Sequence, residues 1–137
     1  MTLEQFAQWC ERKQREIRKL DYTETLRQIV ELLIQSVSRC FDESHDPDGA
    51  PWQPLELAYR RPLVGKHGFM KRYVIASYRA AEIQPRSLTI DVDSEVAAWH
   101  NFGLKKRPQR ELLGFGQSDE DRAADLVAEK TTELLLT

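Results

Sequence analysis

The sequence predicts an α+β fold, in which a small antiparallel sheet is packed by an N-terminal helical pair and a C-terminal helix. Two amphipathic helical patterns fill residues 1–41, an alternating pattern lies near residue 90, and a third helical pattern closes the chain. Because a lone hairpin is only marginally stable in water, we expect the helices to cover the sheet. The 137 residues fit a single domain, with loops and strands over 42–117 and the last helix over 118–135.

The first predicted helix begins at Thr2, which forms a capping-box pattern with Gln5. Apolar residues then recur at helical spacing, at Leu3, Phe6, Cys10, Ile17 and Leu20. Lys13 interrupts this stripe, so we expect the helix to be only partly buried.

The second predicted helix starts at Asp21, with Glu24 following in its first turn. Its apolar residues repeat at three- and four-residue steps, which places them on one face: Leu26, Ile29, Val30, Leu33, Val37 and Cys40. The pattern ends where Asp42 opens a proline-rich loop.

The middle of the chain contains one ambiguous segment and one strand. The stretch "FMKRYVIASYRAAE", residues 69–82, has β-branched and aromatic residues that favour a strand and alanines that favour a helix. In "SLTIDVDS", Leu88, Ile90 and Val92 alternate with polar residues, which is typical of a strand with one wet face.

The third predicted helix begins with Ser118, which forms a capping pattern with Asp121. One face is shared by Ala123, Leu126, Val127, Lys130, Thr131 and Leu134. The helix therefore presents a largely apolar side to the rest of the domain.

The acidic loop "CFDESHDPDGAPWQPL" raises the question of a calcium site. With Gly49 at the sixth position of an EF-hand loop, the twelfth position, which needs a bidentate Glu, falls on Leu55. The register fails, so Asp46 and Asp48 are not expected to hold a metal. The loop is instead interpreted as a proline-braced turn that delivers Trp52 and Leu55 to the core.

The remaining residues carry no signature of catalysis. The histidines make no HExxH spacing, the glycines make no phosphate-binding loop, and both cysteines fall on apolar helical faces as expected for buried thiols. A metal-dependent hydrolase using the Asp46 and Asp48 loop is the remaining enzyme alternative. We expect no enzyme, no cofactor, no secretory signal and no membrane span, and hence a cytoplasmic protein.

Charge is unevenly distributed although the net charge is only -2. The segment from Arg60 to Arg86 is basic, whereas the C-terminal helix is acidic and carries Asp121, Asp125 and Glu129. A small DNA-binding or regulatory module using the segment Arg60–Arg86 is one alternative, but the overall acidity and the lack of a helix-turn-helix pattern disfavour it.

Three stretches, taken in order, resemble a known family. "DPDGAPWQPL" (46–55), "AAWHNFG" (97–103) and "RPQRELLGFGQSDED" (107–121) resemble motifs of the phage virion morphogenesis proteins, the tail completion proteins of Mu-like contractile-tailed phages and prophages. The motif positions have structural interpretations as turn glycines, core residues and their neighbours: Asp46, Asp48, Gly49, Trp52, Leu55, His100, Phe102, Gly103, Leu112, Leu113 and Gly114. Possible interface residues are Arg107, Arg110, Asp121 and Asp125.

The resemblance implies a non-enzymatic assembly role. Such a protein would sit at the head-proximal end of the tail as a ring of identical subunits, contacting the tail tube or terminator on one face and the head connector on the other. It would be made in the host cytoplasm and end in the virion neck. Opposite charges on the basic middle and the acidic C-terminal helix would suit contacts between neighbouring copies.

Overall fold

The computed structural model describes residues 1–52, 71–92 and 115–137. In chain order, α1 (Leu3–Arg18) and α2 (Thr23–Glu43) are followed by a helical segment at 71–79, the hairpin β1 (Glu82–Gln84) and β2 (Ser87–Thr89), and then α5 (Gln117–Leu135). Helices and a two-stranded antiparallel sheet together confirm the α+β class. Predictions that fall on residues 53–70 and 93–114 lie outside the described residues.

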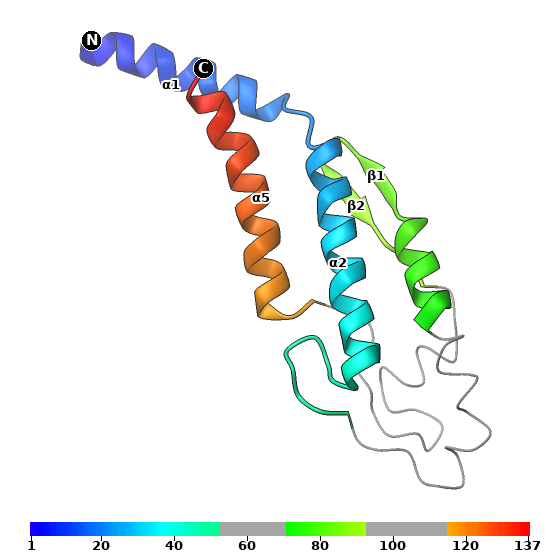
Figure 1. The fold of residues 1–137 in the computed structure, drawn as a ribbon. Coiled ribbons are helices and arrows are strands. Elements are labelled where there is room, and N and C mark those ends of the chain that lie inside the picture. Colours follow the sequence, from blue (N-terminus) through cyan, green and yellow to red (C-terminus); the bar gives the residue numbers. More distant parts are fainter. Residues whose placement is uncertain (53–70, 93–114) are drawn as a thin grey trace, which may run out of the picture.

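Helix α2 lies in the middle of the molecule. It has α5 on one side and the hairpin with the helical segment 71–79 on the other (Figure 1). All six residues of its predicted apolar face are buried or pack against the core. Because α2 is covered on two sides, Leu32 and Ile34 are buried as well, so the buried surface is wider than the predicted stripe.

The ambiguous segment is helical at residues 71–79. Val74 and Tyr78 are its most buried residues and join the core formed by α2. Four residues apart, these two side chains lie on the same face of a helix. The local propensities of this segment for helix and for strand are balanced, so packing against α2 decides that it is helical.

The hairpin follows immediately. Ile83 pairs with Leu88 across the antiparallel strands, and a two-residue turn at Pro85 and Arg86 joins them. The second strand is shorter than the predicted alternating segment, since β1 offers only three residues to pair with. Ile90 and Val92 still pack against the core, so the predicted alternation continues beyond the ladder.

Helix α1 begins with the predicted capping box, in which Gln5 N–H donates to the Thr2 hydroxyl at 3.1 Å. Leu3 is 86 % exposed and Phe6 50 % exposed, so the N-terminal half of the helix is uncovered. Lys13, which interrupts the apolar stripe, is 7 % exposed. Its Nζ donates to the Leu134 carbonyl at 3.0 Å. The lysine therefore anchors α1 to the last turn of α5.

Arg86 fastens the other end of α1. Its guanidinium donates to the carbonyls of Ile17 at 2.9 Å and Arg18 at 3.0 Å. The last carbonyls of a helix have no partner one full turn further on, and a cation there also offsets the negative end of the helix dipole. The Ile17 carbonyl accepts from the Leu20 N–H as well, at 3.1 Å. Arg86 also lies over the ring of Tyr22, 5.5 Å from its centroid. The hairpin turn thus holds the junction between α1 and α2.

Candidate functional site

The Asp-rich loop forms a narrow, closed turn after α2. Ser44 ends the helix in the left-handed conformation with φ 56. The chain then folds back, so that Trp52 N–H donates to the Ser44 carbonyl and Asp46 N–H donates to the Ala50 carbonyl, both at 2.8 Å. Gly49 has φ +93, a conformation that L side chains rarely adopt, and this accounts for a glycine at the tip.

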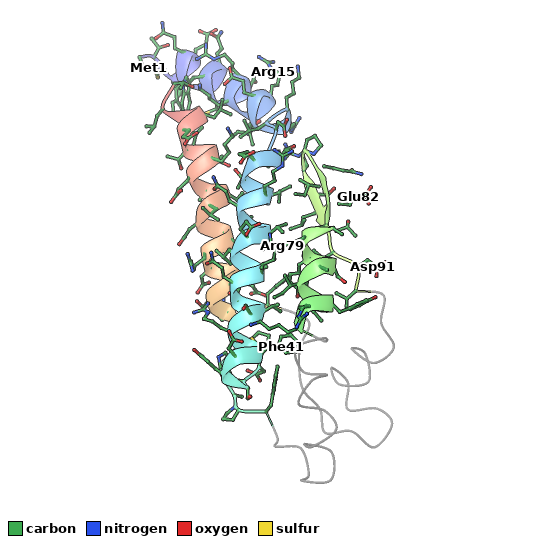
Figure 2. All side chains as sticks on the ribbon, turned by 45° about the vertical axis from the view of Figure 1, so that its right-hand side comes forward. Met1, Arg15, Phe41, Arg79, Glu82 and Asp91 are labelled. Atoms are coloured by element: carbon green, nitrogen blue, oxygen red, sulfur yellow. The ribbon has the colours of Figure 1, made fainter. Side chains whose placement is uncertain are left out.

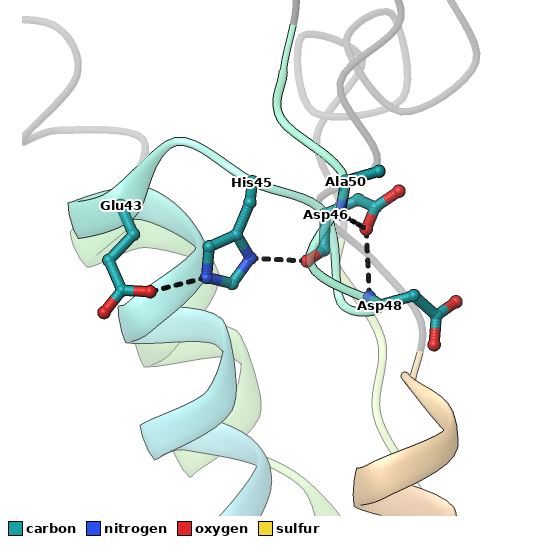
Figure 3. Close-up of polar contacts among 5 residues, drawn as sticks. All are labelled: Glu43, His45, Asp46, Asp48 and Ala50. Atoms are coloured by element: carbon teal, nitrogen blue, oxygen red, sulfur yellow. Dashed lines mark hydrogen bonds and ion pairs between the residues drawn. The ribbon is translucent and has the colours of Figure 1, made fainter.

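Asp46 stabilises this loop from within. Its Oδ1 accepts the backbone N–H groups of Asp48 and Ala50, each at 2.9 Å (Figure 3). This is the arrangement of an Asx turn, in which a short carboxylate replaces a backbone acceptor. The carboxylate is therefore directed at its own loop.

Asp48 caps α5 although the two are far apart in the sequence. Its Oδ1 accepts the N–H of Gln117, the first residue of the helix, at 2.9 Å. The first N–H groups of a helix have no partner inside it, and a carboxylate there also favours the positive end of the helix dipole. The second aspartate of the loop thus fixes where α5 begins. Figure 3 shows its side chain next to the start of that helix.

Gly116 lies directly against the loop. A Cβ on this residue would come 2.2 Å from the Pro47 carbonyl oxygen and 2.8 Å from its carbon, distances that no side chain tolerates. Glycine is required here for close backbone approach rather than for an unusual φ, since its φ is -73. Loop and helix are in backbone contact at this point.

Asp119 lies on the inner side of the junction between the Asp-rich loop and the start of α5, which we call the acidic corner. This carboxylate is 5 % exposed and accepts from the Gly116 N–H at 3.1 Å and from the Ser36 hydroxyl at 2.8 Å. It joins α5 to α2. The predicted start of the helix at Ser118 with Asp121 is therefore wrong: the capping residue is Gly116, and Asp119 and Asp48 supply the acceptors.

Trp52 enters the core as predicted. It is 7 % exposed and meets Phe41 edge-to-face, with ring centroids 5.6 Å apart. Cys40 lies in the same small cluster. Burial raises the pKa of the Cys40 thiol to about 11, with help from the carboxylates of Asp119 and Asp46. Such a thiol is protonated at neutral pH and is a poor nucleophile. Cys10, predicted to be buried, is partly exposed.

His45 bridges the end of α2 and the loop. Its Nδ1 lies 2.6 Å from the Asp46 carbonyl oxygen and its Nε2 lies 2.8 Å from Glu43 Oε2 (Figure 3). The backbone carbonyl and then the carboxylate raise the pKa of His45 above its ordinary value, while partial burial opposes them. The doubly protonated ring, which donates at both nitrogens, suits this position best.

The structure brings four of the predicted site residues together at this corner: Asp46, Asp48, Gly49 and Trp52. Several others lie outside the described residues: Leu55, His100, Phe102, Gly103, Arg107, Arg110, Leu112, Leu113 and Gly114. Asp121 and Asp125 are exposed on α5, and Asp121 accepts from the side-chain amide of Gln117 at 2.9 Å. Within residues 1–52, 71–92 and 115–137, no three acidic, histidine or cysteine side chains are placed to hold a metal ion.

The basic segment is partly used inside the molecule. Lys71 pairs with Asp42 at 2.6 Å and Arg79 with Glu31 at 3.3 Å, while Arg86 holds the end of α1. Arg60, Arg61 and Lys66 lie outside the described residues.

Sequence reasoning missed the residues that hold the corner and the helices together, namely Gly116, Asp119, Ser36, Lys13 and Arg86. Only Lys13 had a local signal, because a lysine inside an apolar stripe implies a nearby acceptor.

These features define a structural module: an α+β body whose acidic corner caps and braces a helix. The sequence profile of the phage virion morphogenesis family matches residues 1–131, so the chain belongs to that family and has a structural or assembly role in the phage particle. No match was found among curated proteins or among solved structures. No helix in the described part of the chain is both long and apolar enough to cross a membrane.

Proposed function

We propose that this protein acts in tail completion and head–tail joining, as a ring-forming, non-enzymatic component of the virion neck. Its membership of the phage virion morphogenesis family supports an assembly role. The observation that carries the proposal is the use of the acidic corner. Asp46 and Asp48, the candidates for a metal or hydrolase site, and the buried Asp119 instead accept backbone N–H groups and one hydroxyl.

The proposed mechanism is geometric. A ring needs subunits that present the same surfaces in the same relative positions, so that each contact repeats and the ring closes. The braced corner fixes α5 relative to α2, and α5 then presents exposed acids along its outer side: Asp121, Asp125, Glu129 and Glu133. This acidic surface is the proposed contact between copies.

The proposed partners are further copies of the chain, a tail tube or terminator protein on one face of the ring, and a head connector on the other. The protein would be made in the host cytoplasm and remain at the neck of the finished particle. Neither a cofactor nor a nucleic acid has a place in this scheme.

Deleting the coding sequence from the phage genome that carries it tests the proposal. Lysates should then contain filled heads and separate tails by electron microscopy, and supplying the protein in trans should restore joined particles. Joined, infectious particles from the deletion would contradict a role in head–tail joining. Reversing the charge of Asp121, Asp125 and Glu129 should weaken self-association, and an unchanged oligomer size by light scattering would contradict the ring contact.

A further inference from the structure

The outer side of α1 carries basic residues that form no ion pair with any residue in the described part of the chain. Arg12, Arg15 and Lys19 are exposed and follow one another at steps of three and four residues, which places them on one helical face. None of the three side chains makes an ion pair or a hydrogen bond within the described residues. Lys13 points to α5 instead, and Arg15 lies on the far side of the helix (Figure 2).

The outer side of α5 carries the opposite charge. Asp125, Glu129 and Glu133 border a shallow hollow whose remaining lining is small or apolar, namely Ala128, Thr132 and Leu136. The three carboxylates are exposed and have no cationic partner in the described part of the chain. Leu136, at the end of the hollow, is 82 % exposed. This surface is acidic along its length and apolar at its C-terminal end.

The two surfaces match in pattern when the helices run antiparallel. Along α1, partly exposed Trp9, which stacks on Phe6 with centroids 6.0 Å apart, precedes the three cations. Along α5 in reverse, Leu136 precedes the three acids. At a rise of 1.5 Å per residue, Trp9 to Lys19 spans about 15 Å and Leu136 to Asp125 about 16.5 Å. An aromatic end therefore meets an apolar end while cations meet carboxylates.

These surfaces cannot meet within one molecule. Lys13 fixes the opposite side of α1 against the last turn of α5, so the basic face of α1 points away from its own α5. The described cations of the middle segment offer a weaker match, because Lys71, Arg79 and Arg86 are already engaged internally and exposed Arg72 is a single charge.

We propose that the basic face of α1 in one copy docks antiparallel on the acidic outer face of α5 in the next. The occupant of the α5 surface is thus a second copy of this chain, selected by charge complementarity. Because the two faces are different, each copy binds one neighbour through its α1 face and the other neighbour through its α5 face. Repeating this contact produces a head-to-tail series that closes into a ring. The inference rests on the proposed self-assembly and names its contact.

A charge-swap experiment tests the contact. One variant carries Arg12→Glu and Arg15→Glu, a second carries Glu129→Lys and Glu133→Lys, and a third combines all four. The matched control carries Glu82→Lys and Glu120→Lys, exposed acids away from both faces. Sedimentation velocity at low and high salt gives the dissociation constant, and circular dichroism checks that each variant folds.

Each double reversal should weaken association about tenfold or more, since it places like charges opposite one another. The combined variant should recover most of the affinity, the control should match the wild-type chain, and salt should weaken wild-type association.

Wild-type oligomers with unchanged affinity in both double variants would overturn the inference and the acidic α5 contact, but not self-assembly itself. Failure of the combined variant to recover would also overturn it. A wild-type chain that stays monomeric up to millimolar concentration would exclude a second copy as the occupant and leave the α5 surface to a different protein. The deletion experiment reports on head–tail joining independently of all of these outcomes.

Discussion

Gly116 is the residue at which the loop and α5 come closest. The Pro47 carbonyl occupies the space that any side chain would need, whereas the Cβ of a residue replacing Gly49 would meet nothing within 4 Å. The two glycines are therefore required for different reasons. Gly116 leaves room for the Pro47 carbonyl, and Gly49 adopts a backbone conformation that L side chains disfavour.

Replacing Gly116 by alanine should cost about 3 kcal/mol in the free energy of unfolding, because the loop must move away from the helix. Gly49→Ala should cost about 1 kcal/mol, through backbone strain alone. Urea titration of both variants measures the difference. Equal costs would show that the loop yields easily at Gly116 and would contradict the close contact.

His45 should make stability depend on pH. Its pKa in the folded protein is raised above the ordinary value of 6.5, so the folded state binds the proton more tightly than the unfolded state. This stabilisation is fully present below about pH 6.5 and is lost as the pH rises through the raised folded value. We therefore expect the free energy of unfolding to fall over that interval.

Urea titrations from about pH 6 to about pH 9 measure this loss against a His45→Gln variant, which cannot take up the proton. The slope attributable to His45 should vanish in the variant. An identical slope in both proteins would assign the pH dependence to other groups.

At the scale of elements, the start of α5 is determined from outside the helix. Gly116 has no side chain to cap it, so Asp48 and Asp119 supply the acceptors. Ser118 and Asp121, which have the local pattern of a cap, lie two residues too late. A capping pattern in sequence indicates that a helix starts nearby, but the tertiary partner decides the residue.

Asp48→Ala should cost about 1 kcal/mol, the usual effect of losing a helix cap. Asp48→Asn, which keeps an acceptor oxygen, should cost less. Glu120→Ala, an exposed change in the same first turn, should stay within about 0.5 kcal/mol. Chemical denaturation measures all three, and an Asp48→Ala cost no larger than that of the control would contradict capping from the loop.

How far the sequence predicts each element depends on where its partners lie. The buried face of α2 and the capping box of α1 are local patterns, and both are confirmed. The helical segment 71–79 was ambiguous because Val74 and Ile75 favour a strand until α2 is present to pack against. Asp48 and Gln117 are 69 residues apart, so no local pattern could join them.

The sequence predicts the tight turn at the candidate site but not the role of the acids in that turn. Asp-Gly with flanking prolines indicates a tight turn, and Trp52 is delivered to the core as expected. That the acids of this turn would brace a helix depends on Gly116 and Asp119, which the turn itself does not specify.

At the scale of the whole molecule, α2 is the central element of the described residues. It packs against α5 and the hairpin, and its residues form most of the core. Helix α1, in contrast, contacts the body mainly through Lys13 and the Arg86 contacts at its C-terminal end. Stability should therefore be graded from α2 outward.

Native-state hydrogen exchange should show this gradient, with the slowest amides in α2 and the fastest helical amides in the N-terminal half of α1. Lys13→Met keeps most of the buried stem but removes the charged hydrogen bond, and should speed exchange in α1 about tenfold. Amides of α2 should be unaffected. Equal acceleration in both helices would mean that α1 opens only when the whole molecule unfolds.

Lys13 and Arg86, the two cations that hold α1, also determine when α1 becomes attached to the rest of the molecule during synthesis. Lys13 must wait for the Leu134 carbonyl, which is added 121 residues later. At about 5–20 residues per second, that delay is roughly 6–24 s of synthesis. Helix α1 is therefore made before α5 and gains its Lys13 contact only when α5 follows, so its apolar side stays available to chaperones during that interval.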